Sequence, residues 1–153
     1  MDDINKARKI LDASDLSLVL VKGGNVLFSS SEKGITGLLR AIFLLGQELA
    51  GASLADSIVG RAAAFLALYC GISAVHARLL SEEGESLLVS SGILLSHDRK
   101  VPLILNRAGN GPCPLEEKSR AFESPQQAFK ELSNQFPAAF SEGTHAERKY
   151  SSR

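Results

Sequence analysis

The stretch that decides the fold is residues 73–101, "SAVHARLLSEEGESLLVSSGILLSHDRKV". Its first eight residues alternate between apolar and polar side chains, which predicts a strand with one buried face. Helix signals follow, because Ser81 is a candidate N-cap, acidic residues fill the first turn and Gly92 comes after the last turn. The chain then returns as extended structure. The sequence leaves open whether residues 97–100 form a turn or an exposed part of one strand, and Pro102 argues against a regular central strand.

A strand–helix–strand unit of this kind forms a right-handed parallel crossover, and a β-hairpin is predicted upstream of it. Residues 16–21 and 25–30 are apolar runs that flank a Lys-Gly-Gly turn, and glycines adopt the positive φ of tight turns. A short amphipathic helix, residues 3–12, precedes the hairpin. The sequence therefore predicts an α/β fold with three α/β/α layers and a mixed sheet built from the hairpin and the parallel unit.

Three further segments have the features of helices. Residues 34–51 place apolar side chains at helical spacing, and a glycine would end that helix. Residues 55–71, "ADSIVGRAAAFLALYCG", are apolar nearly all round, which predicts one buried helix with Asp56 as its N-cap and Gly60 in its first turn. Residues 124–136 begin with a capping box and with proline at the first helical position.

Length and composition favour one domain without a strong charge. The chain has 153 residues, of which 44% are hydrophobic, and this is enough for a sizeable core. We expect the domain to span residues 1–137 and the polar residues 138–153 to form a frayed or disordered tail. Acidic and basic residues balance at 17 each, so no strong field favours nucleic acid or an anionic membrane surface.

Cysteine use and apolar segments predict a reduced protein. Cys70 and Cys113 are too few for a secreted disulfide scaffold. The first residues lack the apolar core of a signal peptide, and the longest apolar region, residues 60–71, is too short to cross a bilayer. We therefore expect a cytoplasmic protein with no membrane partner, and association with a second copy stays open.

Residues 106–116, "NRAGNGPCPLE", have more special chemistry than an ordinary loop needs. Gly109 and Gly111 would let backbone amides approach an anion, and Arg107 could meet a phosphate or carboxylate through two hydrogen bonds. The plain alternative is a tight turn. Cys113 could be a nucleophile or a small residue packed inside a rigid loop, and the fixed shape of the stretch favours the functional interpretation.

The second stretch with residues that indicate a site is "DSIVGRAAA", residues 56–64. Asp56 and Arg61 are charges at the border of an apolar segment. Gly60 destabilises a helix relative to alanine, so its use indicates close approach by a ligand or by another part of the backbone. The alternative is that Asp56 is simply a cap and Gly60 a packing contact.

The sequence offers no metal-binding pattern. Three histidines and two cysteines are scattered, and none of them is at ligand spacing. "HAE", residues 145–147, resembles half of the zinc deaminase signature, but it lies in the polar tail and no Pro-Cys element follows it. We expect neither a metal nor a cofactor.

The hairpin "VLVKGGNVLFSS", "DSIVGRAAA" and "NRAGNGPCPLE", in that order, resemble an uncharacterised microbial domain family whose fold is similar to that of the cytidine deaminases. The resemblance covers about residues 16–116, and Asn-Arg-x-Gly-x-Gly-x-Cys-Pro-x-Glu is its most specific part. It implies that the following residues match family motifs: Asp56, Gly60, Asn106, Arg107, Gly109, Gly111, Cys113 and Glu116.

The resemblance also implies a site without zinc. In deaminases the H-x-E motif opens the helix after the hairpin, a place that the predicted elements assign to Asp56 and Arg61. The P-C-x-x-C motif opens the next helix, which begins at Ser81 and Glu82. Neither place has a zinc ligand set, so we expect zinc-dependent deamination to be absent. What remains is a pocket where two helix N-termini, which favour anions, meet the strand ends.

Three hypotheses for the function follow. The first is binding of a nucleotide-like or other small polar anionic ligand without zinc chemistry. The second is a metal-independent enzyme, and the third is a structural scaffold for dimerisation. The candidate catalytic residues are Cys113, Asp56 and Glu116, and the candidate ligand-binding residues are Gly60, Arg61, Ser81, Asn106, Arg107, Gly109 and Gly111.

Overall fold

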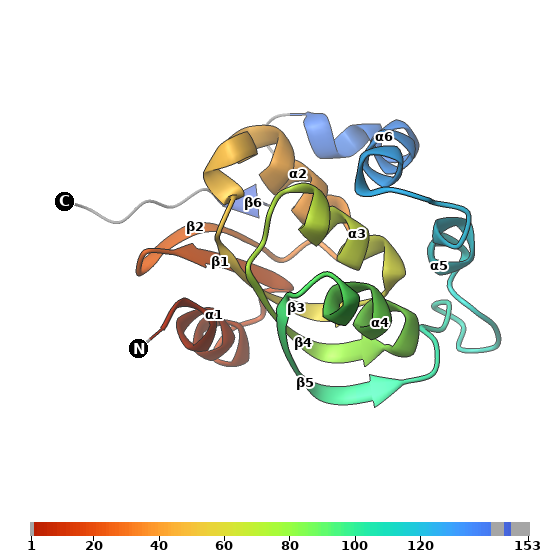
Figure 1. The fold of residues 1–153 in the computed structure, drawn as a ribbon, viewed down its shortest axis with the longest axis horizontal. Coiled ribbons are helices and arrows are strands. Elements are labelled where there is room, and N and C mark those ends of the chain that lie inside the picture. The colour runs from red at the N-terminus through yellow and green to blue at the C-terminus, as the bar shows by residue number, and fades with distance from the viewer. Residues whose placement is uncertain (1, 142–145, 148–153) are drawn as a thin grey trace.

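The computed structural model describes residues 2–141 and 146–147 of the chain. Its elements, in chain order, are α1 (Asp3–Asp12), β1 (Leu18–Lys22), β2 (Asn25–Ser30), α2 (Thr36–Leu45), the 3-10 helix η1 (Gly46–Leu49), β3 (Ser53–Val59), α3 (Arg61–Tyr69), β4 (Ala74–Ser81), α4 (Glu82–Ser90), β5 (Leu94–Val101), α5 (Pro114–Ser119), α6 (Pro125–Gln135), the 3-10 helix η2 (Pro137–Phe140) and β6 (Ala146–Glu147). Figure 1 shows their arrangement around one sheet.

The strands form one mixed sheet in the order β5-β4-β3-β1-β2-β6. β1 pairs antiparallel with β2 and with β3, whereas β3, β4 and β5 run parallel to one another. The predicted hairpin and the predicted parallel strand–helix–strand unit are therefore both confirmed. Because β3, β4 and β5 are parallel, their carboxyl ends and the starts of α3 and α4 lie at the same end of the sheet.

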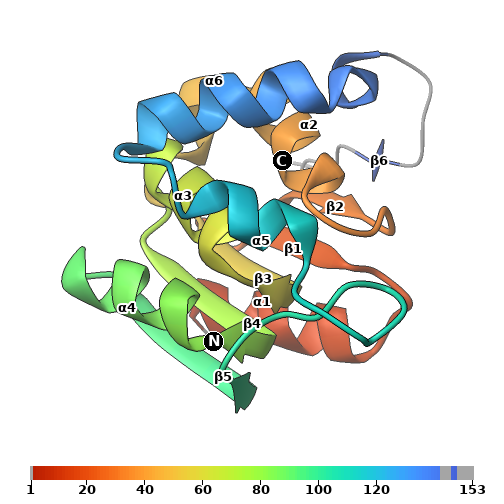
Figure 2. The same ribbon diagram turned by 90° about the vertical axis from the view of Figure 1, so that its right-hand side faces the viewer.

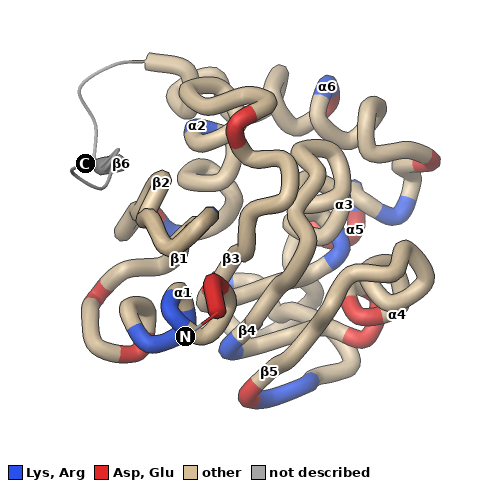
Figure 3. Tube along the Cα trace, turned by 60° about the vertical axis from the view of Figure 1, so that its left-hand side comes forward, with Lys and Arg blue, Asp and Glu red and all other residues tan. Residues whose placement is uncertain are grey.

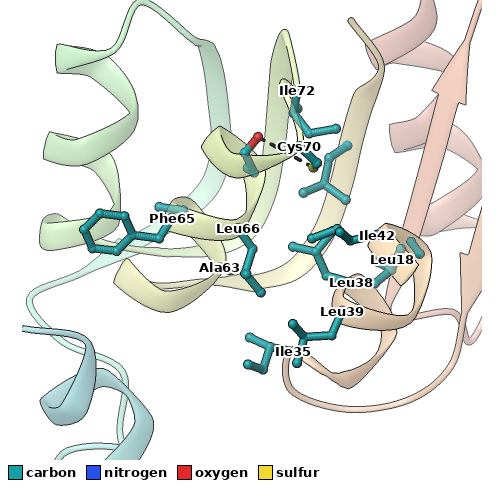
Figure 4. Packing of buried hydrophobic residues seen from close by; sticks show 14 of the residues in the cluster. Leu18, Ile35, Leu38, Leu39, Ile42, Ala63, Phe65, Leu66, Cys70 and Ile72 are labelled. Carbon is teal, nitrogen blue, oxygen red and sulfur yellow. Dashed lines mark hydrogen bonds between the residues drawn. The ribbon is translucent and has the colours of Figure 1, made fainter. Parts of the chain in front are cut away.

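Helices cover both faces of the sheet, which confirms the three α/β/α layers. On one face, α1 packs Ala7 and Leu11 against residues of β1 and β3. On the other face lie α2, α3 and α4, and α6 packs on the outside of α3 (Figure 1). The main core lies between α2, α3 and the sheet, where Leu38 and Ile42 of α2 meet Leu66 of α3 (Figure 4). Burial of each such side chain stabilises the fold by about 2 kcal/mol.

The prediction of one helix over residues 55–71 is wrong, because β3 and α3 share that stretch. Leu54 faces the main core and Ala55 faces α1, so β3 is buried on both faces. A strand of this kind lacks polar alternation, and its periodicity does not distinguish it from a buried helix. Gly60 is the N-cap residue of α3, and Asp56 lies inside β3 instead of capping a helix.

Other boundaries also differ from the prediction. The predicted helix over residues 34–51 is α2 followed by η1, since the chain turns at Gly46 with φ 52°. Residues 97–100 belong to a single strand, β5. The predicted tail starts too early, because Ala139 in η2 is fully buried. Residues 146–147 pair with β2, and the remainder of the predicted disordered tail, residues 142–145 and 148–153, lies outside the described residues.

Neither a membrane span nor a strongly charged face is evident in the described part of the chain. No helix there is long and apolar enough to cross a membrane. In Figure 3, basic and acidic segments alternate along the trace and occur on several elements.

Candidate functional site

Most of the residues singled out by the sequence lie where the parallel strands end. α5 and the loop before it lie across this end of the sheet, next to the start of α3 (Figure 2).

Glu116 of α5 caps the N-terminus of α3. Its Oε1 accepts a hydrogen bond from the Arg61 backbone N–H at 2.5 Å, and its Oε2 accepts one from the Ala62 N–H at 3.2 Å. Burial raises the pKa of Glu116, and the two amide hydrogen bonds oppose that rise. Gly60 makes room for the carboxylate, because a Cβ at this position would lie 2.0 Å from Glu116 Oε1. The close approach expected at Gly60 is thus made by a side chain of the protein itself.

The Arg61 side chain is used within the protein as well. Its Nε donates to the Ser119 carbonyl at 3.0 Å, and its Nη2 donates to the Phe122 carbonyl at 3.3 Å. The guanidinium also lies over the Phe65 ring, 4.9 Å from its centroid. Arg61 therefore attaches α5 and the following turn to α3 through its Nε and Nη2.

The start of α4 is capped in the same way. Ser81 Oγ accepts a hydrogen bond from the Gly84 N–H at 3.0 Å, as the sequence predicted for a cap. A Cβ on Gly84 would lie 3.0 Å from the carbonyl oxygen of Gly60, so the starts of α3 and α4 touch. Both helix N-termini meet at the strand ends, and each already holds an acceptor from the protein.

The glycine-rich loop is organised by its own hydrogen bonds. Leu105 and Pro112 form an isolated antiparallel bridge at its base. The Asn106 side chain donates to Asn110 Oδ1 at 3.0 Å and accepts from the Asn110 N–H at 3.2 Å. Gly109 turns the chain with φ 73°, a conformation that favours glycine. These contacts give Asn106 and Gly109 a structural explanation.

The side chains of Arg107 and Cys113 make no hydrogen bond within the part of the chain that the structure describes. The Arg107 side chain is exposed and has no hydrogen bond or ion pair within the described residues. Cys113 is the half-buried N-cap residue of α5, and its backbone N–H donates to the Ile104 carbonyl. No base contacts its thiol in the described part of the chain, so the structure offers no activating partner for a Cys113 nucleophile.

Asp56 lies in the middle of β3 and is 5% exposed. In the sheet register it is flanked by Leu18 of β1 and Ala77 of β4, which belong to the main core. Its Oδ1 accepts from the Ile58 N–H at 3.3 Å. Burial raises the pKa of Asp56 to about 7, and the amides of Ile58 and Ser57 oppose the rise. Asp56 is thus poised between its charged and neutral forms near neutral pH.

The structure brings together Gly60, Arg61, Glu116 and, through Gly84, Ser81. It does not record a contact between Asp56, Arg107 and Cys113. The helix after the hairpin is α2 and the next is α3, and β3 lies between them. The start of the second helix is therefore Arg61, and the predicted helix start at Asp56 is wrong.

The residues at these helix starts do not fit a zinc site. Among the described residues, no group of three or more histidine, cysteine, aspartate or glutamate side chains is placed to hold a metal ion. Gly60, Arg61 and Ala62 open α3 and supply no thiolate or imidazole.

Sequence reasoning missed Gly84 and the partner of Glu116. Gly84 is the third residue of α4, where a glycine lowers helix stability, and that was a signal of close packing. Glu116 and the amide it accepts from are 55 residues apart, and no local pattern indicates such a pair.

Comparisons with known proteins place the chain. The domain family TM1506, described as a domain of unknown function (DUF1893), matches residues 6–136. The crystal structure of a DUF1893 family protein (TM1506) from Thermotoga maritima is similar with a TM-score of 0.79 and 28% identity, over 88% of this chain and 90% of that chain. A dCMP deaminase from the cyanophage S-TIM5, in apo form, is similar with a TM-score of 0.46 and 14% identity, over 62% of this chain and 93% of that chain. A search of curated proteins found no match. The chain therefore belongs to the DUF1893 (TM1506) family of domains of unknown function.

Proposed function

We propose that the protein binds a small molecule of the nucleoside or nucleotide class through Asp56, without zinc chemistry. The observation that carries the proposal is that Asp56 is the one buried carboxylate among the described residues and that its partners there are amides of its own strand. An ionised carboxylate taken out of water without a full set of donors costs several kcal/mol. Groups held in this condition, with a pKa moved towards neutrality, are concentrated at functional sites.

The chemistry around Asp56 favours a ligand that donates hydrogen bonds. The N-termini of α3 and α4, which would attract an anion, already hold Glu116 and Ser81. Arg61 is engaged with backbone carbonyls. A nucleobase supplies N–H donors that a carboxylate accepts, and a phosphate on the same ligand would meet the exposed Arg107. This differs from the expectation of an anion held by the helix starts.

A catalytic role for the same residue is the second candidate. A carboxylate with a pKa of about 7 is suited to take and return a proton at neutral pH. This observation favours Asp56 over Cys113, whose thiol has no contacting base in the described chain. Binding comes first in either case, so binding is the quantity to measure.

The test is calorimetric titration with cytidine, adenosine and their monophosphates at pH 8, where Asp56 is ionised. We expect saturable binding by at least one nucleoside. Asp56→Asn should weaken it 10-fold or more, because a hydrogen bond to a charged acceptor contributes about 1.5–3 kcal/mol. The matched control is Asp15→Asn, which removes the same charge from an exposed position. Arg107→Ala should weaken the monophosphate and leave the nucleoside unchanged.

The absence of saturable binding by all of these probes would contradict the proposal. Equal dissociation constants for the wild type and Asp56→Asn would also contradict it, because the ligand would then lie elsewhere.

A further inference from the structure

A polar cluster on the opposite face of the sheet joins β4, β5 and α1. His76 of β4 is fully buried, and its Nδ1 lies 2.8 Å from Ser96 Oγ of β5. Its Nε2 lies 3.3 Å from Oδ1 of Asp98, two residues further along β5. Arg8 of α1 also approaches Asp98 at 3.5 Å. A serine, a histidine and an aspartate are therefore in line, although their sequence positions gave no sign of it.

The surroundings of the imidazole decide which of its nitrogens holds the proton. Nε2 faces the Asp98 carboxylate and has no aligned hydrogen bond in the described structure. A carboxylate at this distance stabilises an N–H on Nε2, which leaves Nδ1 as an acceptor for the Ser96 hydroxyl. Burial lowers the pKa of His76, Asp98 and Asp12 oppose this, and Arg8 adds to it. The imidazole is thus neutral at neutral pH and able to take a proton.

We propose that Ser96 is a nucleophile for acyl transfer from small esters, with His76 as its general base and Asp98 as the positioning residue. Ser96 Oγ attacks the ester carbonyl carbon and its proton passes to His76 Nδ1. The tetrahedral intermediate then breaks the bond to the alcohol oxygen, which leaves with that proton. Water attacks the acyl-serine by the same route, so that the balance is ester plus water to acid plus alcohol.

The position of β5 makes this attack accessible. β5 is the last strand of the sheet, so backbone amides on its outer side have no partner strand in the described structure and can stabilise a developing oxyanion. Ser96 is exposed. Leu94, which is 74% exposed and two residues before Ser96 on the same side of the strand, offers an apolar contact for a short acyl chain.

The test uses an alkyl fluorophosphonate, which forms a stable bond to an activated serine and releases fluoride. Intact mass and peptide mapping should locate one adduct on Ser96, and Ser96→Ala should abolish it. Ser90 and Ser91 are internal controls, because they are exposed serines whose hydroxyls donate to the Leu87 carbonyl. His76→Gln should slow labelling about 100-fold or more, and Asp98→Asn about 10-fold.

The pH dependence on the unmodified protein keeps the test independent of the folding of the buried His76 variant. If His76 activates Ser96, the labelling rate should increase with pH as His76 loses its proton below pH 6.5, and it should be constant at higher pH. Three results would overturn the proposal: no adduct on Ser96, equal labelling of Ser90 or Ser91, or a rate that rises in proportion to hydroxide up to pH 10.

Discussion

Glu116 and Asp56 are carboxylates whose pKa is raised by burial, yet their environments differ. Glu116 accepts from two amides at the start of α3, and Gly60 leaves space for it. Asp56 is more deeply buried and has amides of its own strand as partners. The first carboxylate completes a helix and fixes α5, so the fold accounts for it. Burial of the second carboxylate costs free energy, and no contact in the fold explains why it is there. We therefore assign function to Asp56 and structure to Glu116.

The largest expected effect is the pH dependence of the free energy of unfolding that Asp56 causes. Its pKa rises from 3.8 to about 7 on folding, which corresponds to about 4 kcal/mol. Between pH 4 and pH 7 the folded chain holds a proton on Asp56 that the unfolded chain releases. The contribution of this proton to the free energy of unfolding is therefore fully present below pH 4 and is lost as the pH rises through 7. Asp56→Asn should remove this loss.

Urea titrations of the wild type and Asp56→Asn between pH 4 and pH 9 measure this difference. Glu116 and His76 titrate in both proteins and cancel on subtraction. Parallel stability curves for the two proteins would show that Asp56 is not buried as an unpaired acid.

The next effect concerns the space that Gly60 leaves for Glu116. Gly60→Ala should lower the free energy of unfolding by about 3 kcal/mol, because the new Cβ would overlap the carboxylate. Gly111→Ala is the control, since a Cβ there meets its nearest neighbour at an ordinary 3.5 Å. In a Glu116→Ala background the cost of Gly60→Ala should fall below about 1 kcal/mol. An unchanged cost in that background would mean that the contact between the two residues is not the cause.

The smallest effect is the loss of the cap itself. Glu116→Ala should destabilise the protein by about 1–2 kcal/mol, the usual value for removing a side chain that accepts from first-turn amides. Glu117→Ala, on the exposed side of the same helix, should change stability by less than about 0.5 kcal/mol. Thermal unfolding at pH 7 compares the two variants, and equal effects would refute the assignment of Glu116 as a cap.

The elements that the sequence predicted well are those whose ends have a local signal. Two glycines turn the hairpin, and the capped helix α4 separates β4 from β5; both units are present. β3 was missed because it has no polar alternation and continues through Gly60 into an alanine-rich helix. In such a segment the spacing of apolar residues does not distinguish a strand from a helix.

The sequence singled out several residues that the structure brings together, but it did not reveal their contacts. Gly60, Arg61 and Glu116 were singled out separately, and their association depends on a long-range hydrogen bond. The alternation that begins at residue 73 puts His76 on the polar side of its strand, but the contacts of His76 with Ser96 and Asp98 depend on the register between β4 and β5. Register follows from packing of the whole sheet, so a single sequence does not reveal it.

The cap of α3 also has a consequence for the order of events during protein synthesis. The amide of Arg61 is made 55 residues before Glu116. At about 5–20 residues per second, a ribosome needs several seconds to add the missing carboxylate. We expect the first turn of α3 to stay open to water over that interval, and nascent chains stalled before and after residue 116 has left the exit tunnel should differ in their protection from protease.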